Sequence, residues 1–238
     1  MFPKIVYEDE SICVIDKPTG IVVNNSATTK DGDTVQDWFK DKRSRGEGEF
    51  EQKGGVVHRL DKDTSGLLVL AKTAAAYDYL KQQFLNRKAE KSYMALVHGD
   101  VKPEKRIISL PVGRHPGNPK QFAVIEDKAR TAVTQWQVIG RYRDKQTGEI
   151  YSLLMLTPLT GRTHQLRVHL KYFHYPIAGD PIYGDRKSWK KDLKWCPRLF
   201  LHAEKLGLTH PLSFEKMTWE TVFPDDLKSA LNNLEKIE

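Results

Sequence analysis

The feature that most constrains the fold is a series of short apolar runs that follow one another with few helices between them. Runs of strand length lie at residues 4–8, 12–17, 56–60, 67–72, 92–99, 131–139 and 150–157. Consecutive strands joined by short turns pair in the antiparallel direction, whereas parallel strands need long crossovers. The sequence therefore predicts an α+β fold with a largely antiparallel sheet.

Helices are expected to flank this sheet. Thr34, with Asp37 three residues later, resembles a capping box and predicts a short helix ending near Gly46. Apolar residues at helical spacing predict further helices over about 73–91, from 163 onward and over 225–237. The segment 40–55 is rich in charge and glycine, so we expect a solvated surface loop there.

Length and charge narrow the class of protein. The 238 residues fit one large domain or two small ones, and we expect a single domain over 1–238. The formal net charge of +7 favours a polyanionic partner. We expect no membrane partner and no signal peptide, because no apolar run has the required length. With only two cysteines, the reducing cytoplasm is the expected location.

Several kinds of site lack their sequence signatures. The chain contains neither GxxxxGK[ST] nor a GxGxxG that opens a helix. His164, His169 and His174 are spaced by five, which spreads them around a helix, and two isolated cysteines cannot build a thiolate zinc site. Ser65 is outside any nucleophile elbow, and HRLD at 58–61 lacks the other kinase motifs. We therefore expect no metal and no cofactor.

Three segments carry residues suited to chemistry, each with a plainer alternative. In HRLDKDTSGLLVLAK (58–72), Asp61 is either a rigidly held carboxylate at a cleft floor or a turn cap. In KSYMALVHG (91–99), Tyr93 either stacks on a planar base or is a half-buried sheet residue. In TGRTHQLRVHL (160–170), Arg167 either orients a carboxylate across a cleft or lies on a solvated face.

Taken together, these segments resemble the RluA-type family of RNA pseudouridine synthases, from residue 4 to residue 223. The resemblance is carried by HRLDKDTSG at 58–66, with DKPTG at 16–20, SYMALVHG at 92–99, TGRTHQLRVH at 160–169 and RLFLHAEKLGLTHP at 198–211. It implies a mixed, mostly antiparallel sheet with flanking helices and a central RNA-binding cleft. Because the catalytic pattern begins at residue 4, we expect no RNA-binding module before it.

The resemblance also implies roles for individual residues. Asp61 corresponds to the catalytic aspartate, Tyr93 to the tyrosine that packs on the target base, and Arg167 to the residue that pairs with the catalytic carboxylate. Arg59 corresponds to the arginine that helps displace the target nucleotide, and we assign His58 and Arg162 to RNA binding as well. The implied reaction isomerises uridine to pseudouridine in a flipped-out nucleotide. Asp61 acts as an anion, either as nucleophile or as base.

Basic surface is expected to supply further RNA affinity. The richest segment is 185–198, where tryptophans alternate with Arg186, Lys187, Lys190, Lys191, Lys194 and Arg198. The alternative is a solvated loop whose Trp189 and Trp195 belong to the core. A second, sparser patch comprises Lys102, Lys105, Arg106, Arg114 and Lys120.

Two other functions compete with the synthase. A catalytically silent RNA-binding relative would be expected to lose Asp61, Tyr93 or Arg167, and all three are present. A nucleoside glycosidase would need a second carboxylate such as Asp63, and the basic surplus argues against a small substrate. We therefore expect an enzyme that acts as a monomer on ribosomal or transfer RNA, and no binding to DNA.

Overall fold

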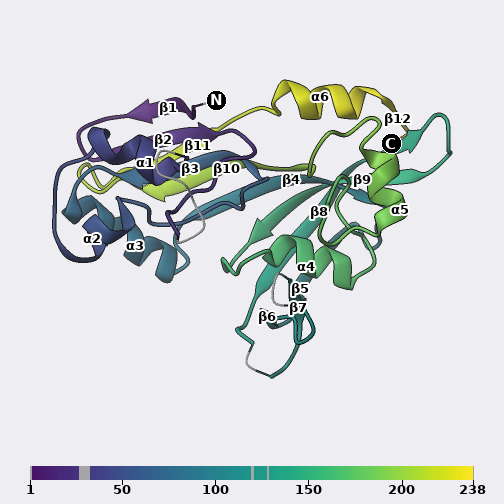
Figure 1. Ribbon diagram of the computed structural model, residues 1–238, viewed down its shortest axis with the longest axis horizontal. Coiled ribbons are helices and arrows are strands. Elements are labelled where there is room, and N and C mark those ends of the chain that lie inside the picture. The colour runs from purple at the N-terminus through teal and green to yellow at the C-terminus, as the bar shows by residue number, and fades with distance from the viewer. Residues whose placement is uncertain (1, 27–32, 119–120, 128, 238) are drawn as a thin grey trace. The chain divides into compact units, whose positions relative to one another are not determined.

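The computed structural model describes residues 2–26, 33–118, 121–127 and 129–237, which divide into two compact units (Figure 1). The first unit holds Met1–Lys91 and Ala203–Thr221. The second holds Ser92–His202 and Val222–Glu238. Each unit has its own strands, helices and apolar core.

The first unit is built on paired strands. Its strands are β1 (Lys4–Glu8), β2 (Ile12–Lys17), β3 (Ser65–Ala71) and most of β10 (Leu201–Thr209), in that spatial order, and β11 (Lys216–Glu220) pairs with β10. The pairs β1–β2, β2–β3 and β10–β11 are antiparallel. Asp9 accepts hydrogen bonds from the backbone N–H groups of Ser11 (2.7 Å) and Ile12 (2.8 Å), which closes the β1–β2 turn. The strands predicted at 4–8 and 12–17 are confirmed.

Helices cover the strands of the first unit. They are α1 (Val35–Phe39), continued by a 3₁₀ turn at Lys40–Lys42, then α2 (Gly48–Lys53) and α3 (Ala74–Leu85). Thr34 caps α1 as predicted, because its hydroxyl accepts from the N–H of Asp37 at 3.0 Å. Tyr77 and Leu80 of α3 are buried in one cluster with strand residues such as Val69 and Leu208.

The loop predicted over 40–55 is wrong in its second half. Residues 48–53 form α2, and Phe50 is buried in the core of the first unit. Arg43 holds Glu51 through two bonds of 2.7 and 2.8 Å, and its guanidinium lies 5.2 Å from the Phe50 ring centroid. A buried aromatic and a bidentate pair thus help to order a segment whose composition is that of a loop.

The second unit has the longer strands. The order is most of β4 (Glu90–His98), then β9 (Ile150–Pro158), β8 (Val133–Asp144) and β12 (Leu234–Lys236), with β5 (Lys105–Ser109) also paired to β8. β6 (Val112–Arg114) and β7 (Phe122–Val124) form a separate antiparallel pair. Three helices complete the unit: α4 (Gln165–Tyr172), α5 (Arg186–Asp192) and α6 (Asp225–Asn232). Leu166 and Leu170 of α4 and Leu227 of α6 are buried in its core.

Two predicted elements of the second unit need correction. The last helix ends at Asn232 rather than continuing to 237, because the chain turns there and Leu234–Lys236 pairs with Asp144, Arg143 and Tyr142 of β8. The basic segment 185–198, for which a solvated loop was the alternative interpretation, contains α5. The fold class is confirmed as α+β with a mixed, mostly antiparallel sheet and flanking helices. Within the described residues, no helix is both long and apolar enough to cross a membrane.

Candidate active site

The segment that carries Asp61 is a turn leading into a fully buried strand. The N–H of Thr64 donates to the carbonyl oxygen of Asp61 at 3.2 Å, and every residue of β3, from Ser65 onward, is buried. Asp61 is half-buried at the start of this turn. The strand predicted at 56–60 is wrong: Val56 alone forms a bridge, to Leu70. The reason is that the His58 ring, rather than a backbone carbonyl, accepts the N–H of Val69, at 3.1 Å.

A second turn, at residues 17–21, fixes the Asp61 turn in place. Lys17 is fully buried, and its ammonium donates to the carbonyl oxygens of Pro18 (2.9 Å), Ile21 (3.0 Å) and Lys62 (3.2 Å). The N–H of Gly20 also reaches the Lys62 carbonyl at 2.9 Å, and the Thr19 hydroxyl reaches the Asp63 carbonyl at 3.0 Å. Gly20 adopts a φ of +85°, which favours glycine. The backbone that directly follows Asp61, at residues 62 and 63, is thereby held.

His58 and Arg59 are used in opposite ways. The His58 ring stacks on Phe84 with centroids 4.3 Å apart and an interplanar angle of 21°. Burial, assisted by the nearby charge of Lys91, lowers the pKa of His58 to about 3, so the ring is neutral and can accept the Val69 N–H. Arg59 is exposed and forms no ion pair with a described residue. Of these two residues, Arg59 has the placement that RNA contact requires.

The second unit supplies Tyr93 and Arg167. Tyr93 lies on β4 opposite Leu156 of β9 and is half-buried against the core of this unit. Arg167 lies in the first turn of α4 and bonds Asp180 through Nε (2.8 Å) and Nη2 (2.7 Å), with side chains 2% and 0% exposed. Its guanidinium also lies 5.0 Å from the ring centroid of Tyr183. Arg167 is therefore a buried, oriented cation.

Asp180 is the partner of Arg167 that the sequence analysis missed. Besides Arg167, its Oδ1 accepts the N–H groups of Ile182 (2.8 Å) and Tyr183 (3.0 Å). Four accepted hydrogen bonds explain how a buried carboxylate is tolerated there. The available signal was an aspartate between Gly179 and Pro181 in an otherwise apolar stretch, which is typical of a structured turn rather than a surface loop.

A satisfied polar network fixes the beginning of α4. The amide of Gln165 accepts from the Thr160 hydroxyl (2.7 Å) and the Arg162 N–H (3.0 Å), and it donates to the Val133 carbonyl and the Thr134 hydroxyl, both at 3.0 Å. Arg162 is half-buried, and its Nε donates to the Thr131 carbonyl at 3.2 Å. The helix that carries Arg167 therefore starts from a rigid turn.

The histidines of this region have separate partners. Nδ1 of His164 lies 2.8 Å from the Tyr183 hydroxyl, whereas His169 lies between the Thr134 hydroxyl (2.9 Å) and the Leu110 carbonyl (3.0 Å). Across the part of the chain that the structure describes, no three His, Cys, Asp or Glu side chains gather as a metal site requires.

The predicted RNA-binding cations differ in placement. On α5 and the turn after it, Arg186, Lys187, Lys190 and Lys194 are exposed, whereas Lys191 pairs with Glu149 at 2.5 Å. In the second patch Lys102, Lys105, Arg106 and Arg114 are exposed, and Arg106 stacks 4.2 Å from the Phe173 centroid. Lys120 lies outside the described residues.

Comparison with known proteins identifies the family. Residues 11–172 match the protein-family model described as RNA pseudouridylate synthase. An uncharacterized RNA pseudouridine synthase of Bacillus subtilis is 35% identical over 98% of this chain and 73% of its own length. A ribosomal large subunit pseudouridine synthase D of Pseudomonas aeruginosa is 37% identical over 97% of this chain and 71% of its own.

A solved structure agrees with these relatives. The human protein RNA pseudouridylate synthase domain containing 1 is 25% identical, with a TM-score of 0.76 over 99% of this chain and 89% of its own. The chain therefore belongs to the RNA pseudouridylate synthase family, and it is an isomerase that acts on RNA. The resemblance inferred from the sequence motifs is confirmed, and a silent RNA-binding relative is not favoured.

Proposed function

We propose that this enzyme isomerises uridine in the RNA of the large ribosomal subunit, with Asp61 as its catalytic carboxylate. The substrate is suggested by the relative from Pseudomonas aeruginosa, whose name specifies that subunit. The observation that carries the role of Asp61 is the support of its turn by buried Lys17 and by β3. A carboxylate that acts at one ribose carbon must be held within a fraction of an ångström, and this support provides such rigidity.

The isomerisation of uridine requires one well-positioned carboxylate from the protein. The bond between ribose C1′ and uracil N1 breaks, a bond between C1′ and C5 forms, and the proton lost from C5 is balanced by one gained at N1. The reaction is redox-neutral, so we propose that it needs no metal or cofactor. Ionised Asp61 acts either as a nucleophile at C1′ or as a base at the ribose.

We further propose that Tyr93, Arg59 and Arg167 serve the same reaction. Tyr93 would pack on the flipped uracil, and exposed Arg59 would fill the vacated stack, offsetting a flipping cost of a few kcal/mol. Arg167 would face the carboxylate of Asp61. In support, its charge is permanent, and Asp180 orients its guanidinium through Nε and Nη2.

The proposal also covers the extent of the domain, two further residues, the oligomeric state and the location of the enzyme. The family match runs through both compact units, which supports one catalytic domain over residues 1–238. Arg162, half-buried before α4, is proposed to contact RNA. The His58 ring is stacked on Phe84 and bonded to the Val69 N–H, so it is better suited to support the Asp61 turn. We propose a monomer that acts in the cytoplasm on RNA and not on DNA.

The test compares two carboxylates of the same turn. Asp61→Asn should abolish pseudouridine formation in an unmodified transcript of large-subunit ribosomal RNA while keeping RNA affinity within about threefold, because the amide preserves shape and removes the anion. Asp63→Asn is the matched control and should remain close to the wild-type rate. The readout is nucleotide-resolution mapping of pseudouridine. Turnover near wild type by Asp61→Asn would reject the assignment.

A further inference from the structure

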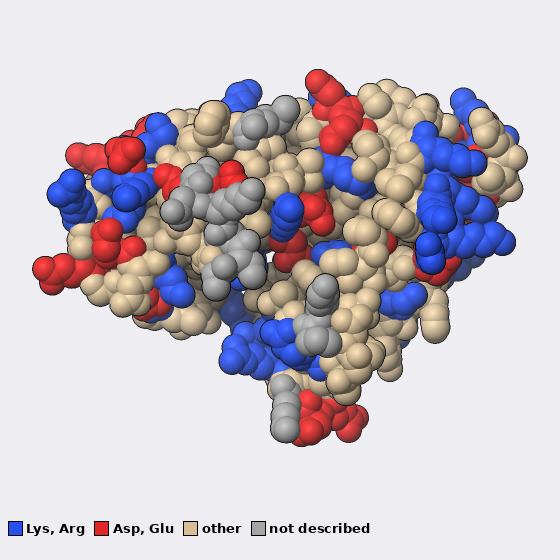
Figure 2. All heavy atoms as spheres, viewed as in Figure 1, with Lys and Arg blue, Asp and Glu red and all other residues tan. Residues whose placement is uncertain are grey.

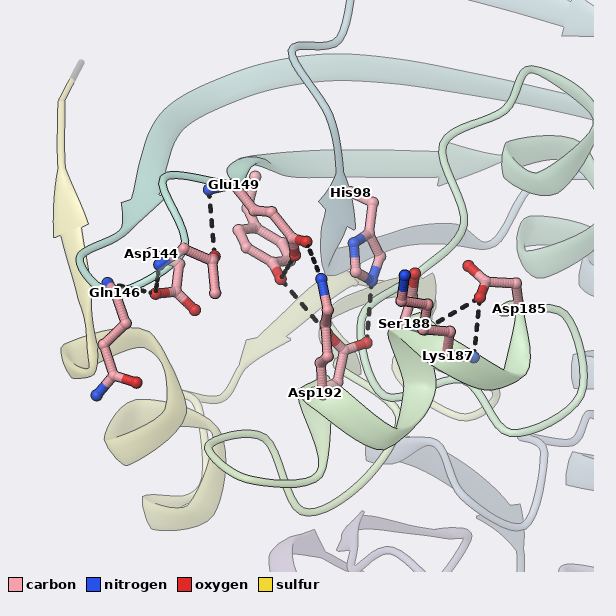
Figure 3. Close-up of polar contacts among 11 residues, drawn as sticks. His98, Asp144, Gln146, Glu149, Asp185, Lys187, Ser188 and Asp192 are labelled. Atoms are coloured by element: carbon pink, nitrogen blue, oxygen red, sulfur yellow. Dashed lines mark hydrogen bonds and ion pairs between the residues drawn. The ribbon is translucent and has the colours of Figure 1, made fainter.

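Helix α5 is held against the rest of the second unit by buried polar contacts (Figure 3). Asp192, 1% exposed at its last turn, accepts from the N–H of Gly179 at 2.8 Å and contacts Nε2 of His98 at 2.9 Å. The hydroxyl of Tyr151 lies 3.4 Å from the other oxygen of the same carboxylate. Just beyond the helix, Trp195 meets the Tyr151 ring edge-on, with centroids 5.2 Å apart. These contacts hold the last turn of the helix against the core.

The acidic groups around α5 are all engaged in local structure. The carboxylate of Asp185 caps the helix, accepting from the N–H groups of Lys187 (2.9 Å) and Ser188 (3.0 Å). Glu149 binds Lys191, and Asp144 accepts the N–H groups of Gln146 and Thr147 in the neighbouring turn (Figure 3). None of these carboxylates forms an ion pair with the exposed cations of α5.

The cations without acidic partners lie on one side of the helix. Within the described residues, Arg186, Lys187, Lys190 and Lys194 are exposed and form no ion pair. Offsets of zero, one and four residues place the first three on one helical face, and the N–H of Lys194 continues the turn by bonding the Lys191 carbonyl. Figure 2 shows Lys and Arg side chains gathered where Figure 1 places α5. At 1.5 Å per residue the row extends over about 12 Å.

We infer that this row, Arg186, Lys187, Lys190 and Lys194, binds the phosphate backbone of the substrate RNA. The inference rests on the proposed function and adds a surface that makes no contribution to the chemical step. Protein interfaces are depleted of lysine and have aromatic or apolar centres, whereas phosphate contacts use lysine and arginine. The tryptophans of the segment are half-buried, and Trp195 packs in the core. The expected contribution is therefore electrostatic and independent of base sequence.

The test uses two triple variants that remove the same charge. One is Lys187→Gln, Lys190→Gln and Lys194→Gln, and its control is Lys53→Gln, Lys228→Gln and Lys236→Gln, three exposed lysines elsewhere. Binding of a uridine-free RNA hairpin, which cannot react, is measured over a series of salt concentrations. The α5 variant should reduce the log–log salt slope by about 2–3 and weaken binding, because each phosphate contact contributes roughly one. The control should change the slope by less than about one.

The maximal rate on ribosomal RNA separates this surface from the catalytic site. At saturating RNA the α5 variant should keep the wild-type rate, because these contacts are made equally in ground and transition states. An unchanged salt slope, or equal changes in both triple variants, would overturn the inference. The row would then contact an acidic protein or solvent instead of RNA. If the wild-type enzyme fails to modify ribosomal RNA, the proposed substrate is wrong, whereas the hairpin result still decides whether α5 binds RNA.

Discussion

Helices α4 and α5 of the second unit contain similar charged residues and use them in opposite ways. Residues 165–170 of α4 are all buried, and among them Arg167 and His169 have protein partners. In α5 the only buried residue is Asp192, whereas three basic side chains are exposed. The same residue types thus serve packing in one helix and a solvent-facing surface in the other.

The difference lies in where the partners come from. Arg167 is satisfied by Asp180, which reaches it from a separate turn, and His169 by Thr134 and Leu110 from other segments. Removing the partner of a buried charge lowers the free energy of unfolding strongly. Removing an exposed charge changes it little. Stability should therefore depend strongly on the buried charge of Arg167 in α4 and weakly on the exposed basic side chains of α5.

The largest expected effect comes from Arg167→Ala. It leaves the carboxylate of Asp180 buried without its bidentate partner, and the free energy of unfolding should fall by about 3–5 kcal/mol. Urea denaturation at neutral pH measures this change. Arg162→Ala, in the turn before α4, is the control, because its Nε donates to a single backbone carbonyl, that of Thr131. The double variant with Asp180→Ala should be less destabilised than the sum of the single variants, and additivity would contradict the pairing.

A smaller effect should follow from pH at His169. Burial lowers the pKa of His169 below 6.5, partly opposed by the Leu110 carbonyl. Because the unfolded chain then binds its proton first, stability is full above about pH 6.5 and decreases as the pH falls below that value. His169→Gln should flatten this dependence, measured as the urea midpoint across the acidic range. Exposed His115→Gln is the control, and an equal flattening there would show that burial of His169 is not the cause.

The smallest effect is expected on α5. Lys190→Gln removes an exposed charge without an acidic partner, so the free energy of unfolding should change by less than about 0.5 kcal/mol. Thermal or urea denaturation is sufficient to measure it. A loss above about 1 kcal/mol would mean that the charge stabilises the fold, and the contrast between the two helices would disappear.

The two helices also show how far sequence reasoning reaches. Leu166 and Leu170 at helical spacing predicted α4, and both are buried as expected. The burial of Arg167 and His169 beside them could not be predicted, because their partners are set by tertiary structure. Helix α5 lacks an apolar stripe, so periodicity gave no helix there, and its available signal was the cap formed by Asp185 three residues before Ser188.

At the candidate site the motifs located Asp61, Tyr93 and Arg167 but not the residues that support them. Lysine is almost never fully buried unless its charge is satisfied, so composition gave no reason to place Lys17 in the interior. The run at 56–60 has the apolar content of a strand. The His58 ring, however, accepts the Val69 N–H that a backbone carbonyl would accept in a paired strand. In each case a specific contact between distant segments outweighed the local pattern.

The buried ammonium of Lys17 also constrains how this enzyme can change over evolutionary time. Its acceptors belong to two stretches of chain, residues 18–21 and residue 62, separated by some forty positions of sequence. An insertion or deletion in either stretch would strand a charge in the interior, at a cost that few single mutations could offset. The two turns should therefore change together in evolution. A descendant that alters the backbone of its Asp61 turn must also alter the DKPTG turn.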